Sequence, residues 1–314
     1  MDKIKILRRY LFLAFPLVFA IAALGQEKPW YPSEWGAQDQ RGAAHRMTPE
    51  KVLEAIQLIK QGKIYQLGRV YEEGMPTGRS RSYRLHIPVP LGPAGKTDTI
   101  AFTEYVCADI GQVGTQLDGL GHVGIGNLFY NGFDQREFAK PSGLEKLGIE
   151  QVGVFFARGV LIDVAGYKGV ERLDKAYEIT TEDLKGALQQ ERVSIHTGDV
   201  VLLYTGWGNL WMKDNMLFLS GEPGIGLAAA QFLVDQKITM VGGDTWATER
   251  WPLEEKDVWF PVHQLLLPKN GIYNLEDLDT SELARDKVYE FAFIFAPLKL
   301  KGATGSPGNP IAVR

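Results

Sequence analysis

The chain has 314 residues, a formal net charge of −4 and an ordinary apolar content of 45%. Both signs of charge are mixed along the sequence and no Lys/Arg run follows the N-terminal segment, which argues against nucleic-acid binding. A single cysteine excludes an internal disulfide, and the length after the first 25 residues suits one large domain or two small ones.

The N-terminal segment is organised like a secretory signal peptide. Basic residues from Lys3 to Arg9 precede an apolar run over 10–23, and Ala23-Leu24-Gly25 is a small-x-small ending. We therefore predict a signal peptide over 1–25 and a secreted or periplasmic protein without stable membrane association after cleavage. An uncleaved N-terminal anchor is the alternative, although the apolar run is short for a membrane span.

The first predicted elements after this segment are one helix and several strands. Thr48-Pro49 is typical of a helix start, and the apolar spacing predicts a helix as far as Gly62. Between 64 and 106 the pattern is strand-like, with Tyr83, Leu85 and Ile87 alternating with polar residues. Cys107 continues an apolar run and is predicted to be buried.

The rest of the chain alternates short apolar strands with amphipathic helices. Strands are predicted over 159–164, 200–204, 238–241 and 289–298, and helices over 181–190, capped by Thr180 or Thr181, and 227–235. This order indicates an α/β fold, a mixed central β-sheet with flanking helices.

One glycine-rich stretch, Asp109 to Gly124, concentrates the polar side chains that could carry chemistry. Gln112, Gln116, Asp118 and His122 lie within eleven positions, interleaved with glycines that disfavour a regular helix or strand. Gln112, Gln116 and Asp118 share parity, so an extended chain would point them the same way. The alternative is a polar turn after a strand.

This stretch resembles the signature of the cyclase family of metal-dependent hydrolases, which includes kynurenine formamidase and isatin hydrolase. The family reads His-x-Gly-Thr-His-x-Asp with a histidine four residues later. This chain has Gln112 and Gln116 in place of both early histidines, and keeps Gly-Thr, Asp118 and His122. The segment from Val262 to Leu278 resembles the family's second site segment.

The resemblance implies one cyclase-family domain over 26–314 with a swivelling β/β/α-like fold, in a homo-oligomer such as a dimer or tetramer. It implies a divalent ion, Mn²⁺ or Zn²⁺, held by Asp118, His263 and Glu276 with weaker help from Gln112 and Gln116, because neutral amides are poorer zinc ligands than imidazoles. It implies His122 as general acid/base.

The function implied is hydrolysis of a small cyclic amide, lactone or N-acyl substrate by metal-activated water. Five tryptophans would favour a flat or aromatic ligand, and would serve a hydrophobic core equally well: Trp30, Trp35, Trp207, Trp246 and Trp251. The alternative is a metal-poor small-molecule binding protein on the same fold.

Overall fold

A computed structural model of the chain describes residues 29–78 and 81–314. The predicted signal peptide over 1–25 lies outside the described residues. No helix in the described part of the chain is long and apolar enough to span a membrane.

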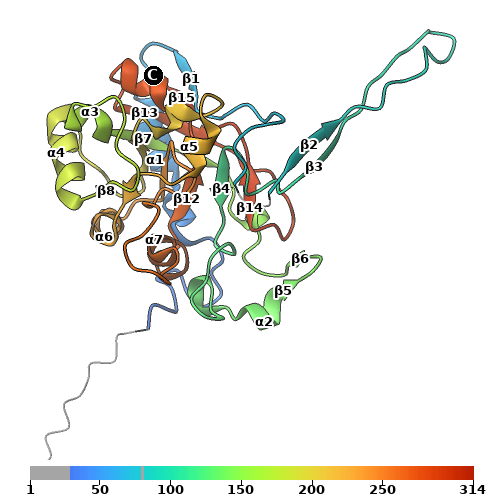
Figure 1. Cartoon of the computed structure of the whole chain (residues 1–314). Helices are drawn as coiled ribbons and strands as arrows, with labels where there is room; N and C mark the ends of the chain where they lie inside the picture. The colour runs from blue at the N-terminus through green and yellow to red at the C-terminus, as the bar shows by residue number, and fades with distance from the viewer. Residues whose placement is uncertain (1–28, 79–80) are drawn as a thin grey trace, which may run out of the picture.

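The described residues build their core on a nine-stranded mixed sheet (Figure 1). Its central strands β7, β9, β11 and β12 run parallel, and the strands toward both edges are antiparallel to their neighbours. In spatial order the strands are β1 (Ile64–Gln66), β15 (Ile311–Val313), β13 (Glu290–Phe295), β7 (Phe155–Asp163), β9 (Val200–Tyr204), β11 (Met240–Gly243), β12 (Tyr273–Glu276), β4 (Gln116–Asp118) and β14 (Gly305–Pro307).

Both faces of the central strands are buried, so their sequences are continuously apolar rather than alternating. In β9, Val201 and Leu203 pack with the helices on one face, while Val200 and Leu202 join the larger cluster on the other. The helices that contribute to the first face include α4 (Thr181–Glu191), α6 (Leu227–Asp235) and α7 (Pro261–Gln264), which continues as a π-helical turn over Leu265–Lys269.

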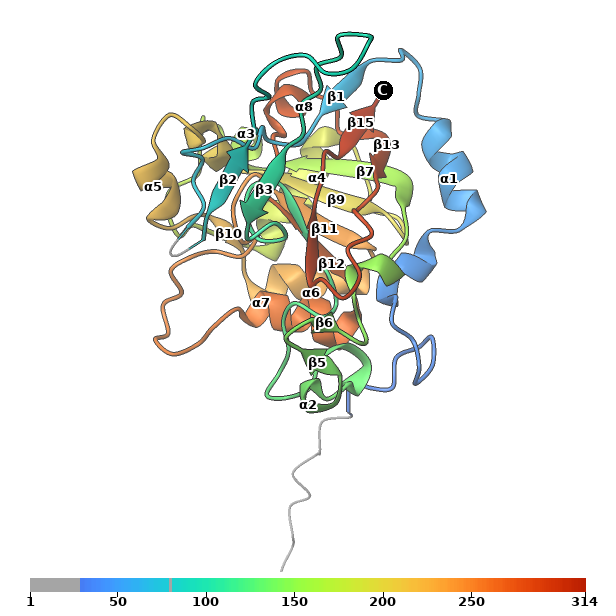
Figure 2. The same cartoon turned by 90° about the vertical axis from the view of Figure 1, so that its right-hand side faces the viewer.

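The remaining elements are short and lie around this core. In Figure 2, α1 and α5 lie on opposite sides of the molecule with the sheet between them. The helices are α1 (Pro49–Ile56), α2 (Gln135–Phe138), α3 (Val164–Lys168), α5 (Asn215–Leu219) and α8 (Ser281–Arg285); the strand pairs are β2 (Tyr83–His86) with β3 (Tyr105–Ala108), β5 (Ala139–Lys140) with β6 (Gly143–Leu144), and β8 (Glu178–Ile179) with β10 (Gly224–Ile225).

The predicted α/β class is confirmed, and so are the best-marked elements. Thr180 caps α4 through a reciprocal hydrogen-bond pair with Asp183, as its sequence predicts. The predicted helix over 227–235 and strand over 200–204 match α6 and β9.

Two local predictions were wrong. Thr48 caps α1 as expected, but the helix ends at Ile56 rather than near Gly62, and Leu53 and Ile56 are exposed. Only the small side chain of Ala55 is buried, against Ala292 and Val313. Cys107 is exposed, because the β2–β3 ribbon that carries it extends away from the core.

Glu191, at the end of α4, makes the fold pH-sensitive. Its Oε1 accepts a hydrogen bond from the Asp163 amide at 2.7 Å, and burial raises the pKa of the Glu191 carboxyl from 4.5 to about 8. Because the pKa of Glu191 is higher in the folded state, the contribution of this carboxyl to the free energy of unfolding is fully present below pH 4.5. It is lost as the pH rises to about 8. We expect Glu191→Gln to become more stable relative to wild type as the pH rises between these two values. Urea denaturation at several pH values measures the free energy of unfolding of both proteins. If the two free energies change with pH in the same way, Glu191 does not have this role.

Candidate functional site

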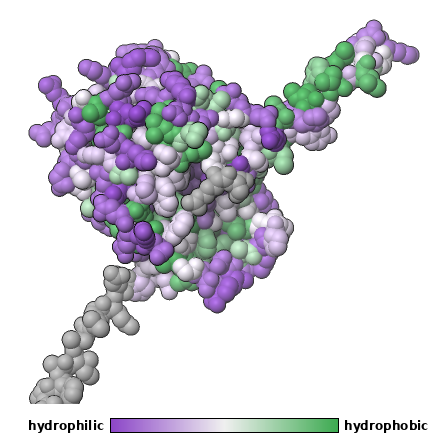
Figure 3. Space-filling view, in the orientation of Figure 1, coloured by the Kyte–Doolittle hydropathy of each residue, from purple (hydrophilic) through white to green (hydrophobic). Residues whose placement is uncertain are grey.

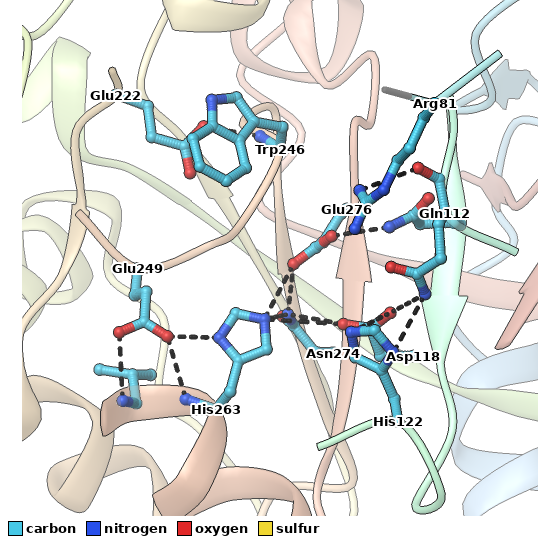
Figure 4. Close-up of polar contacts among 12 residues, drawn as sticks. Arg81, Gln112, Asp118, His122, Glu222, Trp246, Glu249, His263, Asn274 and Glu276 are labelled. Atoms are coloured by element: carbon cyan, nitrogen blue, oxygen red, sulfur yellow. Dashed lines mark hydrogen bonds and ion pairs between the residues drawn. The ribbon is translucent and has the colours of Figure 1, made fainter. Parts of the chain in front are cut away.

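The pairing of β4 with β12 places four polar side chains side by side in the interior. Asp118 lies opposite Asn274, and Gln116 lies opposite Glu276. Residues two apart on a strand point to the same face, so all four side chains share one face. Figure 4 shows three of them, Asp118, Asn274 and Glu276, close together. Each is at most 3% exposed.

The glycine-rich stretch positions β4 and folds Gln112 back toward it. Gly114 has φ +60°, and a Cβ there would lie 2.6 Å from Tyr71 Cε1, so glycine is required on both grounds. Thr115 Oγ1 donates a 2.7 Å hydrogen bond to the Asp277 carbonyl, which ties β4 to the end of β12. Gln112 Nε2 then donates to Asp118 Oδ1 at 3.2 Å.

His263 reaches the same cluster from α7. Its Nε2 lies 3.2 Å from Glu276 Oε1 and 3.6 Å from Asp118 Oδ2. Its Nδ1 forms a short hydrogen bond with Glu249 Oε1, and both Glu249 oxygens accept amide hydrogens at the start of α7. A carboxylate on Nδ1 holds the proton there and leaves Nε2 free to act as a ligand.

Burial and the contacts within this cluster shift the pKa values of Glu276 and His263. Burial, and then repulsion from Asp118, raises the pKa of Glu276 to about 7. Burial alone would lower the pKa of His263, but hydrogen bonds with Asp118, Glu249 and Glu276 outweigh it and raise that pKa well above its ordinary value. When no metal ion is bound, protonated His263 therefore supplies positive charge to these carboxylates.

His122 lies on the outer side of the cluster, in the loop after β4. Its Nδ1 is 3.3 Å from Gln112 Nε2, its Nε2 is 3.8 Å from Asp118 Oδ1, and its side chain is 22% exposed. Burial lowers the pKa of His122 despite the opposing charge of Asp118. A neutral, partly accessible imidazole next to a carboxylate is suited to accept and return a proton.

The donor set fits a divalent ion. The ligand atoms of Asp118, His263 and Glu276 all lie within 4.8 Å of one another. Within the described residues no Lys or Arg forms an ion pair with Asp118, Glu249 or Glu276. Two buried carbonyl oxygens beside them, Gln116 Oε1 and Asn274 Oδ1, have no hydrogen-bond partner. Buried carboxylates and unpaired oxygens at this density favour a bound cation.

A cavity of about 420 Å³ opens in front of this cluster. Gln112 and Gln116 lie on its wall, and Arg81 and Asp277 also line it; burial raises the pKa of the Asp277 carboxyl well above its ordinary value. Trp246, Trp251 and Phe260 form an aromatic wall, with the Trp251 and Phe260 rings stacked at 6.0 Å. Of the tryptophans considered for an aromatic ligand, Trp246 and Trp251 line the cavity, whereas Trp207 packs in the core.

The structure therefore brings together all six side chains singled out in the sequence: Gln112, Gln116, Asp118, His122, His263 and Glu276. It adds Glu249, which no motif marks, and Asn274, which shares parity with Glu276. Asp244, which follows β11, accepts hydrogen bonds from Thr205 and Gly208 and has a structural role.

A second group of possible ligands, Glu54, His196 and Asp199, is compensated by the protein itself. Lys51 Nζ lies 2.6 Å from Glu54 and 2.9 Å from Asp199, and Arg158 also pairs with Asp199. These cations fill the role that a metal would have, so the group is a structural ion network.

Comparisons with known proteins agree with this geometry. The model of the cyclase family matches residues 43–250. No curated protein matches the chain. A crystal structure described as a novel cyclase is 33% identical, covers 89% of this chain and 96% of its own, and superposes with a TM-score of 0.82.

More distant structures share the fold. Isatin hydrolase A from Ralstonia solanacearum is 21% identical, with 80% of this chain and 92% of that chain covered and a TM-score of 0.60. A predicted metal-dependent hydrolase from Bacillus stearothermophilus is 20% identical, with 80% of this chain and 97% of that chain covered and a TM-score of 0.53. The family match spans most of the chain and includes the glycine-rich stretch with Asp118 and His122, so this protein belongs to the cyclase family.

Proposed function

We propose that the protein is a metal-dependent hydrolase that opens a small cyclic amide or lactone, or removes an N-acyl group. The observation that carries the proposal is the buried Asp118–His263–Glu276 cluster, short of positive charge, behind an aromatic-walled cavity. The names of similar structures, among them isatin hydrolases and metal-dependent hydrolases, support the same class.

Asp118, His263 and Glu276 would hold a divalent ion, Mn²⁺ or Zn²⁺, with Gln112 and Gln116 as weaker oxygen donors. When bound, such an ion polarises a carbonyl and lowers the pKa of water to near neutrality. Glu249 keeps the His263 proton on Nδ1, and Asn274 donates to Glu276 Oε1 at 2.7 Å, so both ligands are oriented in advance.

The other residues bind the substrate and move the proton. Trp246, Trp251 and Phe260 offer flat surfaces for an aromatic or planar substrate. His122 accepts a proton from the attacking water and returns it to the leaving nitrogen or oxygen, so one imidazole acts in both halves of the reaction. Arg81, at the same cavity, offers a positive charge to the carboxylate that such hydrolysis releases.

The test is elemental analysis of the gently purified protein, followed by assay with cyclic amides, lactones and N-formyl aromatic amines. We expect one or two divalent ions per chain, and hydrolysis that a chelator removes and Mn²⁺ or Zn²⁺ restores. Protein that takes up neither ion yet remains folded and binds these compounds without cleaving them would overturn the proposal in favour of a binding protein.

The two glutamines allow a gain-of-affinity prediction. Because imidazole binds zinc better than a neutral amide does, Gln112→His combined with Gln116→His should raise zinc affinity. Competition with a chromophoric chelator measures this change. Gln151→His with Gln189→His, two exposed glutamines outside the cluster, is the matched control. Equal zinc affinity in all three proteins would place Gln112 and Gln116 outside the ligand set.

We also propose that the mature protein is secreted or periplasmic, on the strength of the N-terminal sequence alone.

A further inference from the structure

Asn274, on β12, contacts every member of the proposed metal-ligand cluster through one atom. Its Nδ2 donates a 2.7 Å hydrogen bond to Glu276 Oε1, and also lies 3.1 Å from His263 Nε2 and 3.5 Å from Asp118 Oδ2. Figure 4 shows these contacts converging on Asn274. Polar residues cover much of the body of the molecule in Figure 3, but Asn274 is completely buried, so its amide depends on partners inside the protein.

The oxygen of the same amide has no partner. Asn274 Oδ1 is buried and accepts no hydrogen bond from any described residue. Gln116 is arranged in the same way, because its Nε2 donates to Glu276 Oε2 at 2.9 Å while its Oε1 is buried and unpaired. Buried polar atoms without partners are uncommon in native proteins, and each needs a physical explanation. Here both amides direct their hydrogens at the Glu276 carboxylate and leave their oxygens, the better metal ligands, unused.

A cation in the cluster would reverse the preferred orientation of the Asn274 amide. An NH₂ group carries only hydrogen-bond donors and cannot coordinate a metal, whereas an amide oxygen is an ordinary ligand of hard divalent ions. Because Nδ2 contacts all three ligand side chains, an ion held by them would adjoin this amide and repel its hydrogens. The two ends of an amide have nearly the same size, so a half-turn about the last side-chain bond exchanges them while β12 stays in place.

We propose that Asn274 is a further ligand of the divalent ion, and that its amide turns over when the ion binds. In the metal-free protein Nδ2 donates to Glu276, and in the metal-bound protein Oδ1 faces the ion. Strand β12 then supplies two ligands, Asn274 and Glu276, from one face, opposite Asp118 and Gln116 on β4. This assignment rests on the metal site of the proposed function, and deepens it by adding a ligand from the centre of the cluster.

The Asn274 oxygen also affects which ion the site prefers. Zinc is bound best by imidazole and thiolate ligands, whereas carboxylate and carbonyl oxygens suit manganese. With Asp118, Glu276 and Asn274 as ligands, oxygen atoms outnumber the nitrogen of His263. Loss of the Asn274 oxygen should therefore weaken Mn²⁺ binding more than Zn²⁺ binding.

The alternative is that Asn274 only donates a hydrogen bond that orients Glu276. Two variants distinguish coordination from donation. Asn274→Asp keeps an oxygen at both ends of the group and lacks the amide hydrogens. Asn274→Leu has a similar size and has neither an oxygen nor a donor.

Chelator competition measures the affinity of each variant for Mn²⁺ and Zn²⁺. If Asn274 is a ligand, Asn274→Leu should weaken Mn²⁺ binding at least ~10-fold, with a smaller loss for Zn²⁺, and Asn274→Asp should bind both ions at least as tightly as wild type. Asn209→Leu is the matched control and should bind both ions like wild type, because the Asn209 amide donates to Tyr204 outside the cluster. The proposal is overturned if Asn274→Leu binds Mn²⁺ like wild type, or if Asn274→Asp binds it more weakly.

Crystal structures of wild type without metal and with Zn²⁺ provide a measurement that needs no variant. With the ion located by its anomalous scattering, the nearest atom of the Asn274 side chain should lie at a coordination distance of about 2.0–2.2 Å. A bound ion more than about 3 Å from this side chain, or separated from it by a water molecule, overturns the proposal alone. If neither Mn²⁺ nor Zn²⁺ binds wild type, the metal-dependent function fails as well, so the two failures are distinguishable.

Discussion

Replacing His122 by alanine should lower turnover by about two to four decades while the bound metal remains near the wild-type level. The side chain of His122 is 22% exposed, whereas Asp118 is fully buried, and His122 Nε2 lies 3.8 Å from Asp118 Oδ1. Its lowered pKa keeps it neutral, and therefore able to take a proton, at neutral pH. Steady-state hydrolysis of the best substrate, with elemental analysis of the same samples, separates a role in proton transfer from a role in metal binding.

Three other histidines serve as controls for this substitution. His45 hydrogen-bonds Asp39, His86 lies on the β2–β3 ribbon, and His196 contacts Glu54, so none touches the cluster. Their alanine variants should keep most activity. Loss of metal together with activity in His122→Ala would make His122 a ligand, and full activity would leave it with a structural role only.

The convergence of the site could be predicted because its residues obey a simple periodicity. Gln116 and Asp118 share one strand face, and glycine at positions such as Gly114 allows the chain to bring Gln112 back over them. Helix α4 was predictable for a similar reason, since Thr180 and Asp183 form a local capping pair. Both features depend on contacts between residues close together in the sequence, and such contacts can be inferred from the sequence alone.

Features decided by distant contacts could not be predicted. Glu249 is a single carboxylate in an irregular segment, and only the docking of α7 brings His263 onto it. The alternation of Tyr83, Leu85 and Ile87 correctly indicates a two-faced strand, but nothing local tells whether its apolar face meets the core of the same chain. The burial predicted for Cys107 failed for this reason, because no part of the chain within 29–78 and 81–314 covers it.

Replacing Asp118 by asparagine should abolish metal-induced stabilisation. Asp118 is fully buried, yet contacts with His122, His263 and Gln112 outweigh burial and lower the pKa of its carboxyl. The ionised carboxylate therefore stabilises the metal-free fold at pH 8, and its neutral isostere should lose that contribution. With metal, wild type gains about 2.7 kcal/mol at a ligand concentration of 100 times Kd. The variant should show a somewhat lower Tm than wild type without metal at pH 8, and no rise with Mn²⁺ or Zn²⁺.

Glu249→Gln provides the graded comparison for Asp118→Asn. Glu249 contacts His263 Nδ1 and the start of α7 but lies on the far side of the imidazole from Asp118 and Glu276. Changing such an outer partner typically costs about 10- to 100-fold in metal affinity. Loss of the Asp118 carboxylate should cost more, because it removes a ligand charge. Chelator competition and thermal unfolding with and without metal measure both variants. If Glu249→Gln weakens binding more than Asp118→Asn, or if both keep the wild-type Tm rise, Asp118 is not a ligand and the buried carboxylates must be stabilised by His263 alone.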